Sequence, residues 1–293
     1  YGINNTIGKP TFNQVKKIII QAAANGVEYI DTARGYGNSE EVLGEVLNSD
    51  LKYNLKVLTK LSSLNNCSES DSKENIQTYV RESVFESCVR LKSNSLYCLM
   101  LHRAELLQKW DEIIWRELID LKSKNYIQKL GVSVQTPEEL DYALGFDEIE
   151  VIQMPFNIFD YRWNDCIIKI QRLKHKRSLT IHARSSLLQG LLASENHQVW
   201  AKTHLLNPGI AIDWLSLSCK KYHKSSVVDF CFSYVRAQTW IDGVVVGMET
   251  VEQLCQNLVI FDQPELTESD IVEINNSRPI LPEKFLNPSY WSS

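Results

Sequence analysis

Short apolar runs and stretches of helical periodicity alternate along most of the chain. The runs are apolar almost throughout, as the strands of a parallel sheet covered on both faces are. Parallel strands need crossover connections, which are usually helices, so the alternation predicts an α/β fold. We expect seven strands, at residues 26–30, 56–60, 95–102, 128–133, 150–153, 178–182 and 243–246.

Helices are expected before, between and after these strands. The expected ranges are 12–25, 40–47, 73–91, 110–124, 137–144, 163–174, 210–222, 227–235 and 251–259. Thr11 and Ser39 stand where the first two helices begin, and we expect both to act as N-caps. Seven strands are one fewer than a closed (β/α)8 barrel requires, and the chain opens on a loop and a helix where a strand should come first.

A polar motif, DTARGYGNSE at residues 31–40, directly follows the first expected strand. Asp31 should end that strand and Tyr36 should lie in the next loop, where Gly35 and Gly37 allow a sharp turn. Sites of (β/α)8 barrels are built from such strand ends and the loops after them. A capping aspartate with a packed tyrosine would give the same pattern, so the motif is informative only with partners from other strands.

Polar residues and one glycine end or follow the expected strands, namely Asp31, Lys60, His102, Ser133, Gln153, His182 and Gly247. In a parallel barrel these positions converge on one rim. A lysine that reaches solvent and a histidine bonded to backbone would explain Lys60 and His102 singly. Their complementarity to Asp31 and Tyr36 favours a site instead.

Asp31, Tyr36, Lys60 and His102 together have the chemistry of a general-acid site for carbonyl reduction. A buried Lys60 ammonium needs Asp31 as its counter-ion. A cation beside Tyr36 favours the phenolate, which lowers a pKa that starts near ~10. His102 can hydrogen-bond the same carbonyl oxygen that Tyr36 would protonate. The set lacks only a hydride donor.

These four residues, in this order on successive strands, resemble the catalytic positions of the aldo/keto reductase superfamily. Residues 31–40 are similar to its first signature, 57–60 to its lysine strand and 99–103 to its histidine strand, and the resemblance extends to about Phe261. It implies a (β/α)8 TIM barrel, here without its first strand. It also implies NAD(P)H-dependent reduction of an aldehyde or ketone to an alcohol, or the reverse, without a metal.

The resemblance further implies a set of cofactor-binding residues. Ser133 and Gln153 match positions that hold the nicotinamide carboxamide, and residues 246–257 resemble the segment that grips the adenosine end. The implied set is Ser133, Gln153, Arg184, Ser185, Leu187, Gly190, Gly247, Met248, Gln253, Gln256 and Asn257. The implied cofactor is NADP, with NAD as the alternative.

Three positions depart from the family pattern. Arg184 stands where an aromatic residue commonly stacks on the nicotinamide, and its guanidinium can either stack there or face a phosphate or the substrate. Val134 replaces an asparagine that often follows the carboxamide serine. Gln253, with Glu249 nearby, replaces the arginine that many members direct at the 2′-phosphate, which leaves the preference for NADP over NAD open.

Two other functions fit parts of the sequence. A metal-dependent barrel hydrolase would use His102, His182 and Asp31 as ligands, but no H-x-H or H-E-x-x-H spacing is present. A nicotinamide-binding regulatory or scaffold subunit with little turnover is the second alternative, and the complete tetrad argues against it. Neither a G-x-G-x-x-G motif nor a Walker A motif is found.

The segment around Arg184 suggests a small polar or sugar-like carbonyl substrate, and Trp163 and Trp200 are interpreted as packing residues. The net charge of −5 argues against nucleic acid as a partner. The most basic stretch, residues 169–177, is interpreted as the solvated end of a helix.

The seven cysteines, at positions 67, 88, 98, 166, 219, 231 and 255, are scattered and include no C-x-x-C pair. This pattern favours a reducing compartment over a disulfide framework or a zinc site. No long apolar run and no lipidation motif is found. We therefore expect a cytoplasmic protein without a membrane partner, whose oligomeric state is open.

No linker or shift in composition divides the sequence, so we expect a single domain over residues 1–293. The opening residues resemble the end of the loop that follows the family's first strand. We therefore expect the chain to be an N-terminal truncation of a longer protein. Such a chain should be poorly soluble and weakly active, because the missing strand leaves two unpaired sheet edges.

Overall fold

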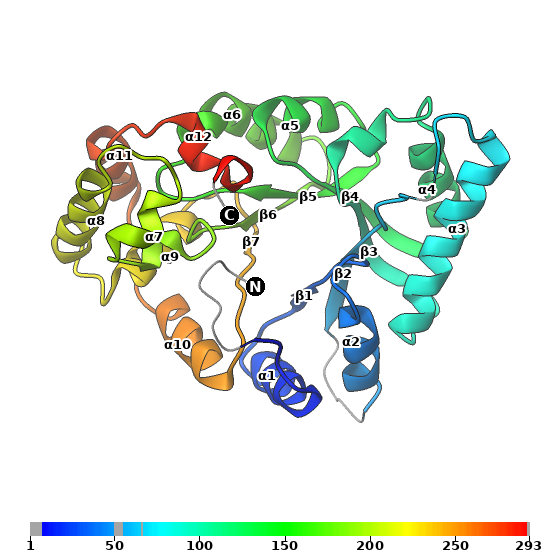
Figure 1. Cartoon of the computed structure of the whole chain (residues 1–293), viewed down its shortest axis with the longest axis horizontal. Coiled ribbons are helices and arrows are strands. Elements are labelled where there is room, and N and C mark those ends of the chain that lie inside the picture. The colour runs from blue at the N-terminus through cyan, green and yellow to red at the C-terminus, as the bar shows by residue number, and fades with distance from the viewer. Residues whose placement is uncertain (1–7, 50–54, 66, 292–293) are drawn as a thin grey trace. The chain divides into compact units, whose positions relative to one another are not determined.

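The computed structural model of the chain describes residues 8–49, 55–65 and 67–291 (Figure 1). The chain divides into two compact units, each described here by itself. The N-terminal unit comprises Pro10–Gln153 and Arg172–Thr180, and the C-terminal unit comprises Met154–Gln171 and the chain from Ile181 onward, with residues 8 and 9. The sequence led us to expect that the first barrel strand, before the first helix, is missing; that expectation lies outside the described residues. The expectation of a single domain stays a prediction.

Seven parallel strands, β1 to β7, follow one another in sequence order. The N-terminal unit holds β1 (Tyr29–Asp31), β2 (Lys56–Lys60), β3 (Leu96–Leu101), β4 (Ile127–Ser133) and β5 (Ile149–Pro155) as far as Gln153. Each of these strands pairs in parallel with the next. The expected α/β fold is confirmed, as are the positions of the strands apart from a few terminal residues.

The first strand is shorter and less buried than expected. Gly26, with a φ of 82°, closes the turn after the first helix, so β1 begins only at Tyr29. The Tyr29 side chain is 39% exposed. Among the described strands β1 has a neighbour on one side only, and an edge strand of this kind is less covered than an internal one.

Five helices accompany these strands: α1 (Phe12–Ala24), α2 (Ser39–Leu47), α3 (Lys73–Arg90), α4 (Ile113–Ser123) and α5 (Pro137–Ala143). In Figure 1, α2, α3 and α4 follow one another beside β1 to β4. Thr11 caps α1 as expected, in a capping box with Gln14. Ser39 does not cap α2, because it is already helical and its hydroxyl accepts a hydrogen bond from Thr32 Oγ1 at 2.8 Å.

Helix α4 begins at Ile113, although the sequence analysis expected it to begin at Trp110. The reason is local, since Trp110, Asp111 and Glu112 all have left-handed backbones, with φ of 50°, 51° and 63°. The short helix η1 (Ala104–Leu107) precedes this turn and was not expected.

The core of the N-terminal unit is tightly packed around Gly131 of β4. Leu58, Cys98, Met100 and Val151 form a buried cluster drawn from β2, β3 and β5. A Cβ atom built on Gly131 would lie 2.5 Å from the carbonyl oxygen of Val151 and 2.8 Å from Cγ of Met100. Only glycine fits there without displacing its neighbours.

The basic stretch at residues 169–177 is not wholly solvated, which corrects its interpretation as a solvated helix end. The Arg177 guanidinium donates to the carbonyl oxygens of Phe146 at 2.6 Å and Leu144 at 3.1 Å. These carbonyls lie between α5 and β5, where a helix end leaves acceptors unpaired. Arg177 therefore stabilises that turn.

The C-terminal unit contains β6 (Thr180–Arg184) from Ile181 onward and β7 (Gly243–Val244), which pair in parallel. Its helices are α6 (Asn164–Lys174) as far as Gln171, α7 (His197–Ala201), α8 (Gly209–Lys221), α9 (Val227–Arg236), α10 (Val251–Phe261), α11 (Glu268–Ser277) and α12 (Glu283–Leu286). Helices α7, α11 and α12 lie where none was expected.

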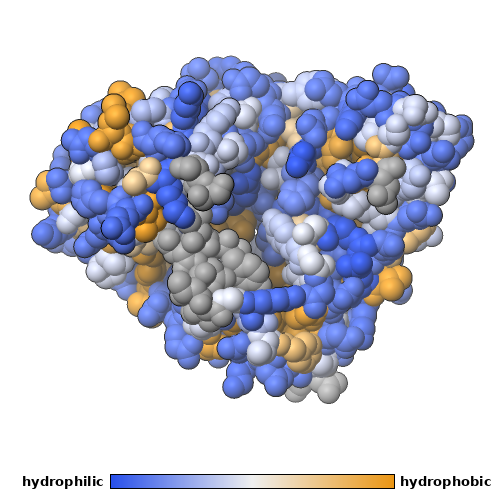
Figure 2. All heavy atoms as spheres, viewed as in Figure 1, coloured by the Kyte–Doolittle hydropathy of each residue, from blue (hydrophilic) through white to orange (hydrophobic). Residues whose placement is uncertain are grey.

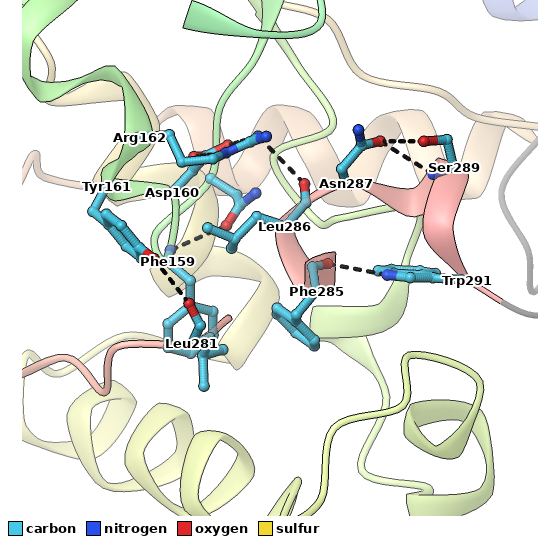
Figure 3. A network of polar contacts seen from close by, with 11 residues as sticks. Phe159, Asp160, Tyr161, Arg162, Leu281, Phe285, Leu286, Asn287, Ser289 and Trp291 are labelled. Atoms are coloured by element: carbon cyan, nitrogen blue, oxygen red, sulfur yellow. Dashed lines mark hydrogen bonds and ion pairs between the residues drawn. The ribbon is translucent and has the colours of Figure 1, made fainter. Parts of the chain in front are cut away.

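The end of the described chain packs on the segment that follows β5 (Figure 3). The Tyr161 hydroxyl donates to the carbonyl oxygen of Leu281 at 3.3 Å, and the Trp291 indole donates to that of Phe285 at 3.0 Å. Phe285 stacks on Trp200, with ring centroids 5.7 Å apart. Trp163 and Trp200 are fully buried, which confirms that they are packing residues.

All seven cysteines are free thiols, and five of them are buried. Burial raises the pKa of Cys98 to about 12 and also raises the pKa of Cys231, so both act as core residues. None of the helices among the described residues has the length and apolar character needed to cross a bilayer. Helices α8 and α11 expose Ile210, Leu217 and Val272, and apolar surface is visible over these helices in Figure 2.

Candidate active site

Lys60 and Asp31, the last residues of β2 and β1, form an ion pair in the N-terminal unit. Lys60 Nζ lies 2.8 Å from each carboxylate oxygen of Asp31 and 2.9 Å from the carbonyl oxygen of Thr32. Lys60 is 1% exposed, so its charge is almost wholly removed from water. An ammonium has three N–H donors, and these acceptors can offset much of the cost of its burial. The predicted counter-ion is confirmed.

Gln153 of β5 adds a third strand to this cluster. Its Nε2 donates to Asp31 Oδ1 at 2.8 Å, and the side chain is 2% exposed. One carboxylate therefore joins the ends of β1, β2 and β5. The sequence analysis assigned Gln153 to the cofactor and missed this bond, because the two residues are 122 positions apart in sequence.

The loop after β1 positions Tyr36. The Arg34 N–H donates to the carbonyl oxygen of Lys60 at 3.2 Å, so the chain stays beside β2 until the tyrosine loop begins. Gly37 then takes a φ of 61°, as the turn requires. Gly35 has no left-handed backbone, but a Cβ there would lie 3.9 Å from the His102 ring. Tyr36 itself is 49% exposed.

The Tyr36 ring lies close to both of its expected partners. Its centroid is 5.3 Å from Lys60 Nζ and 5.8 Å from the centroid of the His102 ring, with the two rings at 82° to each other. His102 directly follows β3 and is half-buried. The four predicted side chains, from the ends of β1, β2 and β3 and the loop after β1, therefore come together, with a buried charge beside a tyrosine that is open to solvent.

A buried carboxylate, missed by the sequence analysis, supports this cluster. Glu40 of α2 is 1% exposed, accepts a hydrogen bond from Thr59 Oγ1 at 2.7 Å, and lies 3.5 Å from Arg34 Nη1. Thr59 precedes Lys60 in β2, and Arg34 precedes the tyrosine loop. Arg34 also pairs with Glu86 of α3. The only signal in the sequence was an arginine and a glutamate on either side of Tyr36 in one motif.

Ser133 and Gln153 are direct partners in the register of β4 and β5. They are 7% and 2% exposed, so both are buried at the same level of the sheet. A hydroxyl and an amide can each donate and accept hydrogen bonds, as a primary carboxamide ligand requires. Their chemistry fits the predicted role.

In the C-terminal unit, Arg184 ends β6, and a tight turn runs from Ser185 through Leu187 to Gly190. Gly190 has a φ of 84°. Ser186, the residue after Ser185, has a buried hydroxyl with no hydrogen-bond partner among the described residues. Leaving such a group unpaired costs about 1–3 kcal/mol, which favours a polar ligand group there. Its neighbours Ser185 and Leu187 were expected from the sequence, whereas Ser186 was not.

The remaining expected residues lie at the start of α10 in the same unit. Gln253 Oε1 accepts from the Glu249 N–H at 2.7 Å, and the Gln253 N–H donates to the capping hydroxyl of Thr250 at 3.2 Å. Gln253 thus closes the helix start and supplies no cation. Gly247 and Met248 precede this cap, and a Cβ on Gly247 would meet nothing within 4 Å. Gln256 and Asn257 lie on the next turn of α10.

The residues considered for a metal site are not all in one unit. Asp31 and His102 belong to the N-terminal unit, and His182 belongs to the C-terminal unit, where it is buried in β6. Within the described ranges, no three or more His, Cys, Asp or Glu side chains are grouped so that they could hold a metal ion. Asp31 is instead paired with Lys60.

The fold identifies a parallel α/β protein of the (β/α)8 class, with seven strands among the described residues. Its sequence narrows the class, because residues 1–278 match the Aldo/keto reductase family. The chain belongs to this family, and the resemblance predicted from its motifs is confirmed. Membership in this family supports the assignment of the protein as an oxidoreductase that acts on small carbonyl compounds.

Individual relatives agree with this assignment. The uncharacterized oxidoreductase YqkF of Bacillus subtilis (strain 168) is 24% identical over 268 residues, which are 88% of this chain and 86% of that protein. Aldo-keto reductase AKR11C1 from Bacillus halodurans, in its holo form, aligns with a TM-score of 0.74 and 18% identity, over 92% of this chain and 88% of its own. Glycerol dehydrogenase AKR11B4 from Gluconobacter oxydans aligns with a TM-score of 0.70 and 22% identity, over 92% and 87%. At these identities the structural likeness shows the fold alone.

Proposed function

We propose that this protein catalyses the NAD(P)H-dependent reduction of an aldehyde or ketone to an alcohol, or the reverse reaction. One observation carries the proposal: the buried Lys60–Asp31 ion pair lies beside the Tyr36 ring, which makes an edge-to-face contact with the His102 ring. A buried lysine that served packing alone would not need an exposed tyrosine near its charge.

In this proposal Tyr36 is the general acid. Tyr36 is half-exposed, and its hydroxyl would donate a proton to the carbonyl oxygen as the alcohol forms. The Lys60 ammonium, 5.3 Å from the ring centroid, stabilises the phenolate that remains. His102 donates a hydrogen bond to the same carbonyl oxygen and orients it. Asp31 and Gln153 hold the ammonium in place.

NAD(P)H, when bound, would supply the hydride that no side chain of this protein can supply. Ser133 and Gln153 suit its carboxamide, and the buried Ser186 hydroxyl suits a further polar group of the cofactor. We assign to cofactor binding the set expected from the sequence: Ser133, Gln153, Arg184, Ser185, Leu187, Gly190, Gly247, Met248, Gln253, Gln256 and Asn257. Ser186 is added to that set.

NADP is the cofactor we propose first, with weak discrimination against NAD. Gln253 is neutral and already bonded to the Glu249 N–H, so it offers no charge to a 2′-phosphate. A charge-assisted contact contributes about 1.5–3 kcal/mol, or roughly ten- to a hundred-fold in affinity. We expect the ratio of the Kd values for NADH and NADPH to fall below that range in a fluorescence titration. A ratio of roughly a thousand-fold would show that another cation binds the phosphate.

The substrate we propose is a small polar or sugar-like carbonyl compound, in keeping with the name of the structurally similar glycerol dehydrogenase. A cytoplasmic location, supported by the scattered free thiols, and a single-domain organisation belong to the same proposal.

The decisive variant is Tyr36→Phe, which keeps the ring and removes the proton. Its kcat with a reactive aldehyde should fall by roughly two to four powers of ten, while the Kd for the cofactor stays unchanged. Tyr142→Phe is the matched control, because Tyr142 is similarly exposed, at 40%, and lies on α5. Wild-type turnover in Tyr36→Phe would refute the assignment. Cofactor binding without turnover in the wild type would favour a nicotinamide-binding regulatory subunit.

A further inference from the structure

A pocket in the N-terminal unit opens beside the proposed catalytic pair. It has a volume of about 560 Å³, and Gly35 and His102 form part of its wall. Small-molecule sites usually have volumes of about 300–1,000 Å³. A molecule in this pocket lies next to His102 and to Gly35, the residue before Tyr36. The character of the remaining wall therefore bears on the substrate.

The remaining wall is mixed: Leu64, Cys67 and Leu106 are apolar, and the other lining side chains are polar and include two cations. Ser63 and Asn65 come from the loop after β2, and Arg103 and Lys109 come from the segment that follows His102. One acid, Glu105, also lines the pocket. The formal charge of these lining side chains is therefore positive when His102 is neutral.

The contacts of the two cations leave both able to meet a ligand. Arg103 Nη1 lies 3.6 Å from Glu105 Oε1, but both side chains are well exposed, at 73% and 58%, so solvent screens the pair. Lys109 Nζ lies 4.4 Å from the centroid of the Trp110 ring. A cation–π contact at an exposed site is weaker than a charge-assisted hydrogen bond, so Lys109 can bind an anion at little cost.

The backbone of this segment holds Lys109 in place. The Lys109 N–H donates to the carbonyl oxygen of Glu105 at 3.2 Å, at the end of η1. The Trp110 indole donates to the carbonyl oxygen of Ser68 at 3.1 Å, which ties the segment to the loop after β2. The backbone of Lys109 is thus fixed at the edge of the pocket that its side chain lines.

We propose that the substrate carries an anionic group, a carboxylate or a phosphate, which Lys109 and Arg103 bind while the carbonyl group lies beside Tyr36 and His102. This inference rests on the proposed function and adds the substrate class to it. Ser63 and Asn65 would bind further polar atoms of such a compound. No covalent step beyond carbonyl reduction is involved.

A matched pair of aldehydes tests the charge directly. 4-Carboxybenzaldehyde is anionic at pH 7, whereas methyl 4-formylbenzoate has a similar shape and is neutral. We expect kcat/KM to be roughly ten-fold higher for the acid, at the lower end of what a charge-assisted contact supplies, mainly through a lower KM. Raising the ionic strength should reduce this preference, because exposed charges are screened.

Variants of the pocket should change the preference in opposite directions. The double variant Arg103→Met/Lys109→Met should abolish the preference by lowering kcat/KM roughly ten-fold more for the acid than for the ester. Glu105→Gln should increase the preference. Lys124→Met is the matched control, because Lys124 is an exposed lysine at the end of α4 and outside the pocket lining. Equal kcat/KM for the two aldehydes in the wild type, or a preference that survives the double variant, would overturn the proposal.

Calorimetry separates failure of this inference from failure of the proposed function. If neither aldehyde is reduced with NADPH or NADH, the proposed function fails, and titration of 4-carboxybenzaldehyde and its ester into the protein still tests the pocket. Tighter binding of the acid that is lost in Arg103→Met/Lys109→Met would support the anion site. Equal binding of the two compounds would overturn it.

Discussion

Each unit of this protein buries an ion pair, and the two pairs differ in their surroundings. In the N-terminal unit, Lys60 pairs with Asp31, whose side chain is 19% exposed. In the C-terminal unit, Arg162 pairs with Asp160, with the side chains 8% and 0% exposed. The first pair joins strand ends that are 29 residues apart, whereas the second joins residues two positions apart.

The partners of the two pairs explain the difference in role. Arg162 donates to both oxygens of Asp160 at 2.8 and 2.7 Å, and to the carbonyl oxygen of Leu286 at 3.4 Å (Figure 3). Burial by itself lowers the pKa of Arg162, but hydrogen bonds and attraction from Asp160 outweigh it and raise that pKa. This pair therefore anchors the end of the chain, whereas the Lys60 pair lies beside an exposed tyrosine. A buried ion pair indicates a site only when a reactive group open to solvent adjoins it.

Removing the cation should mainly reduce stability in the Arg162 pair and mainly reduce catalysis in the Lys60 pair. Arg162→Met leaves Asp160 buried without its counter-ion, so the free energy of unfolding should fall by about 3–5 kcal/mol, with kcat per folded molecule retained. Lys60→Met should destabilise the protein less, because Asp31 is partly exposed and keeps its bond from Gln153, but should reduce kcat at least roughly a hundred-fold. Denaturant unfolding and steady-state kinetics measure both effects. Retained stability in Arg162→Met would contradict the anchoring role.

The two units should also differ in their tolerance of a methyl group at a glycine. Gly131→Ala places a Cβ against Val151 and Met100 in the N-terminal core, and we expect a loss of about 1–3 kcal/mol. Gly247→Ala in the C-terminal unit meets open space, and its effect should stay within about 0.5 kcal/mol. Thermal unfolding of the two variants tests whether Gly131 is more tightly packed than Gly247. Equal melting temperatures would contradict this difference.

The smallest expected difference lies in the two capping boxes, each worth about 1 kcal/mol at most. The box of α1 is uncharged, with Gln14, whereas the box of α11 uses Asp270. Hydrogen bonds from the Thr267 hydroxyl and N–H lower the pKa of Asp270 from its ordinary 3.8. Because the folded-state pKa is the lower one, this contribution is present above pH 3.8 and is lost as the pH falls through the folded-state pKa.

The variants Asp270→Ala and Gln14→Ala make this difference measurable. The melting temperature of Asp270→Ala should approach that of the wild type as the pH is lowered below 3.8, whereas the effect of Gln14→Ala should not depend on pH in that range. A pH-independent effect of Asp270→Ala would show that its charge does not contribute.

Local sequence determined the strands, most helices and the family. The apolar runs specify strands of a parallel sheet by themselves, and Thr11 specifies a helix start through a contact only three residues away. The residues Asp31, Lys60 and His102 could be predicted because each ends or directly follows a strand, and Tyr36 because it lies in the loop after one. Parallel strands bring such positions to one edge. Helix α11 was missed because its sequence, ESDIVEINNS, contains only three apolar residues, too few for an apolar stripe.

Tertiary structure alone decided which polar groups meet. The bond from Gln153 to Asp31 and the burial of the Ser186 hydroxyl, which has no partner among the described residues, have no local signal in the sequence. The burial of Glu40 between Arg34 and Thr59 has only a weak one, the presence of Arg34 and Glu40 in one motif. Each of these features arises because folding removes the groups from water and brings them close together. The spacing of two side chains along the sequence shows neither their burial nor their distance in the fold. The sequence thus specified the positions of the reactive groups, and packing decided which of them are buried, paired or open to solvent.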